Sequence, residues 1–315
     1  PNLTNIKRTH YVKQCFALLY LFSMPLFSQD REIYNPGHIT EEIYHQSQDY
    51  VYVGPYTKGL EGPAVDNQGN LYFVNPLHRG SIGKVDIQGN FTLFIKHLPQ
   101  GSVANGIRFG GDQQMFLADY TNHNILTVNL STKEVKVYAH DSLMNQPNDL
   151  AICCNNRMFA SDPNWKDSSG QLWKAENGKL SLLLKDLGTT NGIEASPDEK
   201  TLYVNESVQR NIWAFDLDAQ GNISNKKLFH KFKDHGMDGM RCDIAGNLYV
   251  TRYGKGTIAK LSPQGELLLE ISLKGKKPSN IAFGGKDGRT AFVTLQDRAY
   301  LETFRVEKPG RSFKQ

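Results

Sequence analysis

The stretch Glu61-Gly-Pro-Ala-Val-Asp-Asn-Gln-Gly-Asn-Leu-Tyr-Phe-Val74 is the first of six copies of one pattern. Each copy has a polar residue, usually followed by Gly, then a short apolar run, a turn and a second apolar run. The polar residues lie 42 to 47 residues apart and form one column: Glu61, Asn105, Asn148, Asn191, Asp238 and Asn280. Six such units of short alternating strands predict an all-β fold, a six-bladed β-propeller.

Four strands are predicted in each repeat, and the first repeat illustrates their bounds. They are expected at about 64–66, 71–74, 82–86 and 91–95, with Gly-Asn turns inside the first and last pairs. In the sixth repeat the sequence runs out after a third strand at about 303–306, which would leave an open sheet edge. The segment 41–48 is predicted to supply the missing outer strand and to close the ring.

Residues 1–28 are predicted to be a signal peptide rather than part of the fold. An apolar run at about 15–27 is followed by the small residue Ser28 and preceded by three basic residues: Lys7, Arg8 and Lys13. The run is shorter than the roughly 20 apolar residues of a membrane span. We therefore expect export to the periplasm or cell exterior, no stable membrane insertion after cleavage, and a single propeller over residues 29–315.

The net charge of +4 comes largely from this first segment. Without its three basic residues, 33 Lys and Arg remain against 32 Asp and Glu. So balanced a composition indicates no nucleic-acid partner. The expected partner is a small-molecule substrate, and the composition leaves the oligomeric state open.

The chemistry belongs to the column of six polar residues. In a propeller the first strand of each blade lines the axis, so the column is expected to form a ring around one mouth of the channel. Its two carboxylates and four carboxamides offer oxygen ligands of mixed charge, which suit a hard cation. We therefore predict one divalent cation, Ca²⁺ before Mg²⁺, Mn²⁺ or Zn²⁺. A purely structural polar ring is the alternative.

Four motifs within the repeats carry a family resemblance: Glu61-Gly-Pro, Pro147-Asn148-Asp149, Thr190-Asn191-Gly192-Ile-Glu-Ala-Ser-Pro-Asp and Met237-Asp238-Gly239-Met-Arg-Cys-Asp. They resemble the motifs of the senescence marker protein/gluconolactonase/luciferin-regenerating enzyme-like family, which includes bacterial lactonase and diisopropylfluorophosphatase-like members. The resemblance covers nearly everything after residue 50. It implies one catalytic divalent cation in the channel, with the catalytic carboxylate at Asp238. The implied metal ligands are Glu61, Asn148, Asn191 and Asp238.

Six further residues are candidates for the substrate pocket: Asn105, Gln146, Asp149, Asn280, Asp119 and His235. His235 could act as a proton shuttle or could be a solvated loop residue. Asp119, just after a predicted strand, could reach the pocket or cap the next turn. Sugar-lactone members of the family often carry Arg at the position of Gln146, and this departure weakens the expectation of a gluconolactone-type substrate.

The sequence thus predicts an exported, metal-dependent hydrolase of a lactone or related ester, similar to a gluconolactonase. The cation would polarise the substrate carbonyl, and Asp238 or Glu61 would activate water or attack directly. Two alternatives remain open. One is phosphotriester or fluorophosphate hydrolysis at the same ion, and the other is a non-catalytic propeller that the metal only stabilises while its loops bind a partner.

Overall fold

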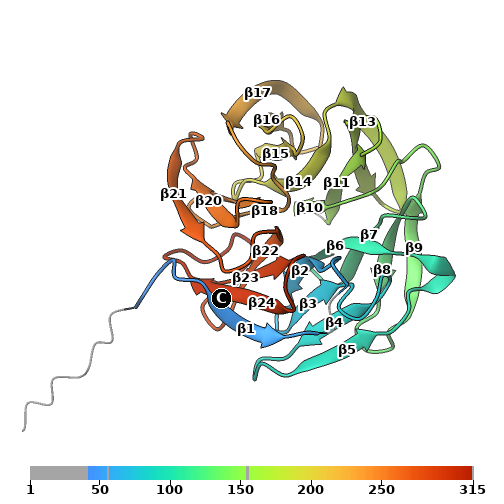
Figure 1. Cartoon of the computed structure of the whole chain (residues 1–315). Coiled ribbons are helices and arrows are strands. Elements are labelled where there is room, and N and C mark those ends of the chain that lie inside the picture. The colour runs from blue at the N-terminus through green and yellow to red at the C-terminus, as the bar shows by residue number, and fades with distance from the viewer. Residues whose placement is uncertain (1–41, 55–56, 154–155, 314–315) are drawn as a thin grey trace, which may run out of the picture. The chain divides into compact units, whose positions relative to one another are not determined.

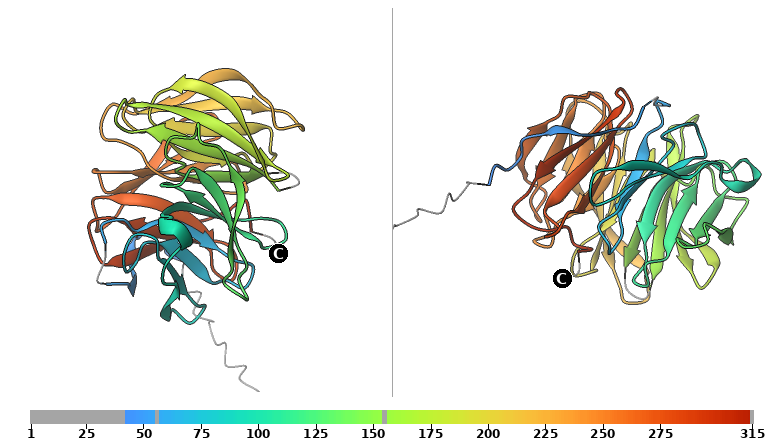
Figure 2. Two further views of the ribbon diagram at one scale, coloured as in Figure 1. Left: turned by 90° about the vertical axis from the view of Figure 1, so that its right-hand side faces the viewer. Right: turned by 90° about the horizontal axis from the view of Figure 1, so that it is seen from below.

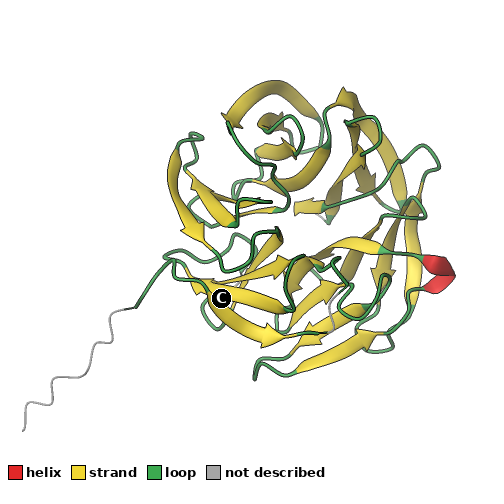
Figure 3. Ribbon diagram, in the orientation of Figure 1, coloured by secondary structure: helices red, strands yellow, loops and turns green. Residues whose placement is uncertain are grey.

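The computed structural model describes residues 42–54, 57–153 and 156–313. These residues form six four-stranded sheets around a central axis (Figure 1), which confirms the predicted all-β, six-bladed propeller. The one helical element within the described ranges is a short 3-10 turn, η1 (Pro99–Gly101), visible in Figure 3. No helix in this part of the chain is long and apolar enough to cross a membrane. The predicted signal peptide, 1–28, lies outside the described residues.

The first three blades each use four consecutive strands, with the first strand innermost (Figure 1). Blade 1 contains β2 (Glu61–Val65), β3 (Leu71–Val74), β4 (Ile82–Val85) and β5 (Phe91–Ile95). Blade 2 contains β6 (Ala104–Phe109), β7 (Met115–Asp119), β8 (Asn124–Val128) and β9 (Val135–His140). Blade 3 contains β10 (Leu150–Cys153), β11 (Arg157–Asn164), β12 (Ser169–Glu176) and β13 (Lys179–Leu187).

Blades 4 and 5 follow the same order, whereas blade 6 takes its outer strand from the N-terminal side. Blade 4 contains β14 (Thr190–Ala195), β15 (Thr201–Glu206), β16 (Asn211–Leu217) and β17 (Ile223–Lys231). Blade 5 contains β18 (Met240–Cys242), β19 (Leu248–Arg252), β20 (Thr257–Leu261) and β21 (Leu267–Ser272). Blade 6 contains β22 (Pro278–Gly284), β23 (Thr290–Leu295), β24 (Tyr300–Arg305) and β1 (Gln48–Tyr52).

Strand β1 closes the ring as predicted, but the predicted bounds of 41–48 were wrong. The strand runs from Gln48 to Tyr52 and pairs antiparallel with β24, with Gln48 opposite Thr303. The reason is side-chain packing, because the aromatic ring of Tyr50 lies 5.0 Å from that of Phe292 and Val53 is buried. The polar segment before Gln48 has fewer apolar side chains to bury against the last blade.

The hydrophobic cores lie between neighbouring blades rather than inside one blade. One cluster joins Tyr72 and Ile82 of blade 1 to Ile107 and Met115 of blade 2. Another joins Phe73 of blade 1 to residues of blade 6 and of β1. Each blade buries its two faces against its neighbours, and the views in Figure 2 show the sheets stacked face to face around the ring. Because every blade is packed on both sides, the inner strands are held in fixed positions around the axis.

Four hairpins share one turn sequence, Asp-x-x-Gly-Asn. In the first, the carboxylate of Asp66 accepts hydrogen bonds from the backbone N–H groups of Gln68 and Asn70 and from the Asn70 side chain, at 2.8 to 2.9 Å. Gly69 follows with a φ of 85°, a conformation that favours glycine. The same network recurs in the turns that begin at Asp86, Asp218 and Asp243.

Candidate active site

The column residues stand where the inner strands begin, next to irregularities in the strand pairing. The pairing of β2 with β3 shifts between Glu61 and Ala64, and β14 shifts between Thr190 and Ile193. Such β-bulges turn a side chain away from the regular pleat. The same shift occurs in β6 and β22. In these four blades the bulges direct the column side chain toward the axis, whereas Asn148 and Asp238 precede strands that pair without a shift.

The glycine that follows several column residues allows the inner strands to approach each other closely. A Cβ atom on Gly62 would overlap the backbone oxygen of Asn105 in the next blade, and one on Gly192 would overlap the backbone oxygen of Asp238. A Cβ on Gly239 would overlap the side chain of Asn280. Each of these glycines lies against the column residue of the following blade, so the absence of a side chain lets the inner strands pack closely near the axis.

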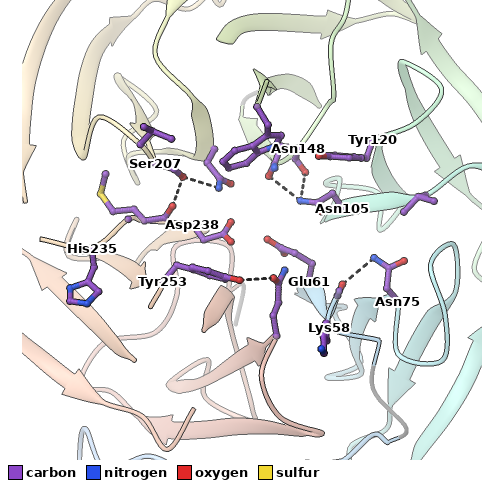
Figure 4. Close-up of a pocket in the computed structure, with 18 of the residues that line it drawn as sticks. Lys58, Glu61, Asn75, Asn105, Tyr120, Asn148, Ser207, His235, Asp238 and Tyr253 are labelled. Atoms are coloured by element: carbon purple, nitrogen blue, oxygen red, sulfur yellow. Dashed lines mark hydrogen bonds between the residues drawn. The ribbon is translucent and has the colours of Figure 1, made fainter. Parts of the chain in front are cut away.

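Two carboxylates, Glu61 and Asp238, point toward one another across the axis (Figure 4). Glu61 is buried, whereas Asp238 is partly accessible. Burial raises the pKa of both carboxyl groups above their usual range. The charges of Glu61 and Asp149 raise the pKa of Asp238 further, and Glu61 and Asp238 are hydrogen-bonded to each other. The two carboxyl groups therefore resist ionising together, and among the described residues no basic side chain forms an ion pair with either of them.

Three of the carboxamides around this pair are held in place because their side-chain nitrogen atoms donate hydrogen bonds. Asn191 Nδ2 donates to Ser207 Oγ at 3.0 Å, and Asn280 Nδ2 donates to Glu61 Oε2 at 3.1 Å. Asn105 Nδ2 donates to Asn148 Oδ1 at 3.0 Å. The oxygen of Asn191 is buried and has no hydrogen-bond partner among the described residues, although buried polar atoms are nearly always paired.

These donors fit a hard divalent cation. Among the described residues, no group of three or more His, Cys, Asp or Glu side chains could hold a metal ion. Carboxamide oxygens would therefore have to complete the ligand set beside Glu61 and Asp238. The orphaned oxygen of Asn191 is available for such a role, and mixed carboxylate and amide oxygens are the ligands that Ca²⁺ takes in proteins.

A cavity of about 630 Å³ opens above the two carboxylates (Figure 4). Glu61, Asn148, Asn191 and Asp238, the four predicted ligands, all line it. Of the six predicted pocket residues, only Asn105 and His235 line it. The side chain of His235 is exposed, and its Nδ1 lies 3.3 Å from Asp234 Oδ2.

The other four predicted pocket residues do not line the cavity. Asp119 is buried and accepts hydrogen bonds from Ser102 Oγ at 2.7 Å and from Asn124 Nδ2 at 2.8 Å, so its carboxylate stabilises a turn. Gln146 lies outside the lining, where its Oε1 accepts a bond from the backbone of Trp165. The remaining two, Asn280 and Asp149, are buried beneath the cavity floor.

A second polar layer lies deeper in the channel, and the sequence analysis did not predict it. Arg108 and Arg241 are each three residues after a column residue, about 10 Å further along a strand. The carboxylate of Asp149 forms ion pairs with both arginines: its Oδ1 lies 2.9 Å from Arg108 Nη1 and its Oδ2 lies 3.4 Å from Arg241 Nη1. Burial alone would raise the pKa of Asp149, but these two charges hold it below its usual range. Arg311 pairs with Glu194 at 2.7 Å in the same layer.

The cavity walls come from loops whose roles the repeat pattern does not show. The lining residues that were not predicted include aromatic, basic and small polar side chains from all six blades: Lys58, Asn75, Arg79, Tyr120, Trp165, Ser207, Arg210, Tyr253 and Gln296. Tyr253 donates to Gln296 Oε1 at 3.2 Å. Only Tyr120, as the neighbour of Asp119, carried a positional signal in the sequence.

Comparisons with known proteins place the chain in a family. The model of the SMP-30/Gluconolactonase/LRE-like region matches residues 59–297. Gluconolactonase from Zymomonas mobilis is 29% identical over 270 residues, which cover 74% of this chain and 75% of that protein.

Solved structures show the same fold. A luciferin-regenerating enzyme superposes with a TM-score of 0.72 at 19% identity, covering 85% of this chain and 99% of that one. A calcium-binding protein, regucalcin from Agrobacterium tumefaciens, superposes with a TM-score of 0.71 at 18% identity, covering 82% and 94%. Because the family model spans most of the propeller, the chain belongs to the SMP-30/gluconolactonase/LRE-like family, whose members are gluconolactonase- and lactonase-like hydrolases.

Proposed function

We propose that this protein hydrolyses a lactone or a related ester and that the reaction depends on one divalent cation at the cavity floor. The observation that carries the proposal is the pair of carboxylates, Glu61 and Asp238, beside the unpaired amide oxygen of Asn191 at the bottom of an open cavity. Like charges held together in a partly buried site are typical of functional sites rather than of structural ones. The gluconolactonase relative supports the class of reaction.

Four residues would hold the cation: Glu61, Asn148, Asn191 and Asp238. They come from four different blades, so the cation would also tie the inner strands together. Ca²⁺ is the proposed ion, because all the donors are oxygens and because the structural relative from Agrobacterium is a calcium-binding protein. When bound, the cation would polarise the substrate carbonyl and stabilise the negative charge that develops on its oxygen.

The protein's own groups would divide the remaining work. Asn280 donates to Glu61 Oε2 and so holds the Glu61 carboxylate in place, which suits a ligand. Asp238 is partly accessible from the cavity. We assign to it the reactive role, either accepting a proton from the attacking water or attacking the carbonyl itself. The backbone oxygen of Asp238 accepts a hydrogen bond from Asn205 at 2.6 Å, which fixes the segment that carries it.

Export is a separate part of the proposal and rests on residues 1–28 alone. Their basic start, apolar run and small residue at Ser28 support a cleaved signal peptide. Cell fractionation of the producing organism, with N-terminal sequencing of the mature protein, tests this. Recovery of uncleaved chain from the cytoplasm would contradict it.

The function is tested by metal analysis of the purified protein, followed by a panel of lactones, esters and a phosphotriester. We expect one bound divalent cation per chain and hydrolysis of at least one lactone. The activity should disappear with a strong chelator and return when Ca²⁺ is added. Hydrolysis that persists after verified removal of the metal would contradict the metal dependence. A preference for the phosphotriester would favour the alternative enzyme.

A further inference from the structure

The charges that line the cavity are unevenly divided between its floor and its walls. The lining contains two acidic residues, Glu61 and Asp238, and both lie at the floor. Its walls contain three basic residues, Lys58, Arg79 and Arg210, and no acidic one. A divalent cation would cancel the two floor charges, so the cavity of the loaded protein would be positive.

Two of these basic residues lie on the wall formed by blade 1. Lys58 comes three residues before β2, and Arg79 lies in the connection between β3 and β4. Figure 4 shows Lys58 beside Asn75 on one side of the cavity and His235 on the other. Arg79 lies near Tyr120: burial raises the pKa of that tyrosine, and the charge of Arg79 partly offsets the rise. We call Lys58, Arg79 and Tyr120 the basic wall.

The cations of the basic wall have no acidic partner. Among the described residues, neither Lys58 nor Arg79 forms an ion pair. Basic side chains in the corresponding turns of other blades do: Lys255, between β19 and β20, lies 2.7 Å from Glu270, and Arg298, between β23 and β24, lies 2.6 Å from Glu302. Unpaired cations that face a cavity favour an anionic ligand, because they attract it over a distance and can form charge-assisted hydrogen bonds with it.

Arg210, on the opposite side, has a hydrogen-bond partner for its Nη1, although its buried Nε has none among the described residues. It belongs to the turn between β15 and β16 of blade 4, and its Nη1 donates to the backbone oxygen of Lys233 at 3.0 Å. It is therefore the natural internal comparison for the basic wall. It has the same charge and lines the same cavity, but it already has a protein partner.

We propose that the substrate carries an anionic substituent away from the reacting carbonyl, a phosphate, sulfonate or carboxylate, and that Lys58 and Arg79 bind it. This inference rests on the proposed function, since it names the class of lactone that the site accepts. Tyr120 would give the ring of the substrate an apolar surface beside the anion. The reacting carbonyl would then lie over Glu61 and Asp238, with the charged substituent held at the wall.

The test compares matched neutral and anionic ligands on the cation-loaded protein. Hydrolysis is measured for glucono-1,5-lactone, its 6-phosphate and a lactone with a terminal carboxylate. Binding is measured separately by calorimetry, which needs no turnover, with gluconate, which carries only the carboxylate released from the lactone, and with 6-phosphogluconate and glucarate, which carry a second anionic group. The variants are Lys58→Gln, Arg79→Gln and the double variant. Arg210→Gln is the comparison on the other wall, and Lys136→Gln, on the exposed outer strand β9, controls for net charge.

We expect the parent to favour the anionic ligands, and each basic-wall variant to lose about tenfold of that preference. Arg210→Gln should lose less, and Lys136→Gln should behave as the parent. Equal turnover of the neutral and anionic lactones by the parent, together with equal binding of gluconate and of the ligands with a second anionic group, would overturn the inference while leaving the proposed function intact. So would a preference that survives in the double variant.

A result in which the proposed function fails but the anion site exists can also be recognised. If no lactone is hydrolysed but 6-phosphogluconate still binds more tightly than gluconate, and Arg79→Gln removes the difference, the anion site stands and the proposed function fails. If neither turnover nor preferential binding is seen, both are wrong. The phosphate and carboxylate ligands show which anion the wall prefers.

Discussion

The channel contains two polar layers that differ in how their charges are compensated. In the upper layer Glu61 and Asp238 lie together, no basic residue pairs with either, and the oxygen of Asn191 has no partner among the described residues. In the lower layer Asp149 lies between Arg108 and Arg241, and Glu194 pairs with Arg311. Arg108, Glu194 and Arg241 of the lower layer each stand three residues after a column residue on an inner strand, whereas Asp149 directly follows Asn148 and Arg311 comes from the C-terminal segment.

The difference shows where this fold can do chemistry. A buried charge costs several kcal/mol unless it is paired, and the lower layer meets that requirement with its own arginines. The upper layer has no such partner among the described residues, so its carboxyl groups either keep a proton or need a positively charged ligand when they ionise. We infer that the lower layer holds the ring together and that the upper layer binds the cation and performs the reaction.

The largest expected effect is on activity, from Asp238→Asn. The amide keeps the size and one oxygen ligand but can neither accept a proton nor attack. We expect the rate to fall by about 10²- to 10⁴-fold and to stay low when the protein is saturated with cation. Glu61→Gln should lose affinity for the cation and regain most activity at high concentration. Full activity of cation-saturated Asp238→Asn would refute the assignment of the reactive group.

The next effect is on stability, from Asp149→Asn in the lower layer. This change leaves Arg108 and Arg241 buried without their carboxylate, which costs about 3 to 5 kcal/mol of unfolding free energy. Chemical denaturation measures the loss, and Lys136→Gln on the surface is the control. If Asp149→Asn is as stable as the parent, the lower layer does not have the structural role given to it here.

Removal of the cation comes third. A ligand that binds only the folded state stabilises it by about 2.7 kcal/mol at roughly a hundredfold excess over its dissociation constant. We therefore expect a strong chelator to lower the melting temperature, and Asp238→Asn to show a smaller shift. An unchanged melting temperature, with the metal verified as absent, would indicate that the upper layer is a structural ring.

The upper layer could be predicted from sequence because it follows the repeat. One polar residue stands at the same place in each blade; five of these six line the cavity, and the sixth, Asn280, donates to Glu61 from beneath its floor. The strands could be predicted for the same reason, and β3 and β5 have the predicted bounds. Periodicity is a local signal, and it was sufficient wherever the blades are equivalent.

The lower layer and the cavity walls could not be predicted in this way. Arg108, Glu194 and Arg241 share one position of the repeat, but the other three blades have Ala64, Ala151 and Phe283 there. Their pairing depends on which blades face each other. The basic wall comes from loops, whose conformations the repeat does not fix. The bounds of β1 were missed because that strand follows its packing partner in blade 6 rather than any repeat.

The fourth prediction concerns Ser207, which orients one ligand of the upper layer. Its hydroxyl accepts from Asn191 Nδ2 and donates to the backbone oxygen of Met237, so the oxygen of Asn191 remains turned toward the site. Ser207→Ala should lower the affinity for the cation by about 10- to 100-fold, as loss of a supporting hydrogen bond commonly does. Cation titration by calorimetry measures this. Recovery of affinity in Ser207→Thr would separate orientation from a general loss of packing.

The smallest expected effect is on the pH dependence of stability in the absence of cation, to which the two layers should contribute with opposite signs. The pKa values of Glu61 and Asp238 are raised in the folded protein, so folding favours their protonated forms. Their contribution to stability is therefore fully present below the ordinary carboxyl pKa and is lost as pH rises through the raised pKa values. The pKa of Asp149 is lowered, so its contribution to stability is present above its ordinary pKa and is lost as pH falls through the lowered value.

The chelated parent should therefore melt at progressively lower temperature as pH rises above about 5, by roughly 2 to 4 °C for each kcal/mol lost. Glu61→Gln removes one of the two like charges and should flatten this slope, whereas added Ca²⁺ should reverse it. A chelated protein that becomes more stable over the same pH range would show that the charges of the upper layer are already compensated by the protein, and the contrast between the two layers would not hold.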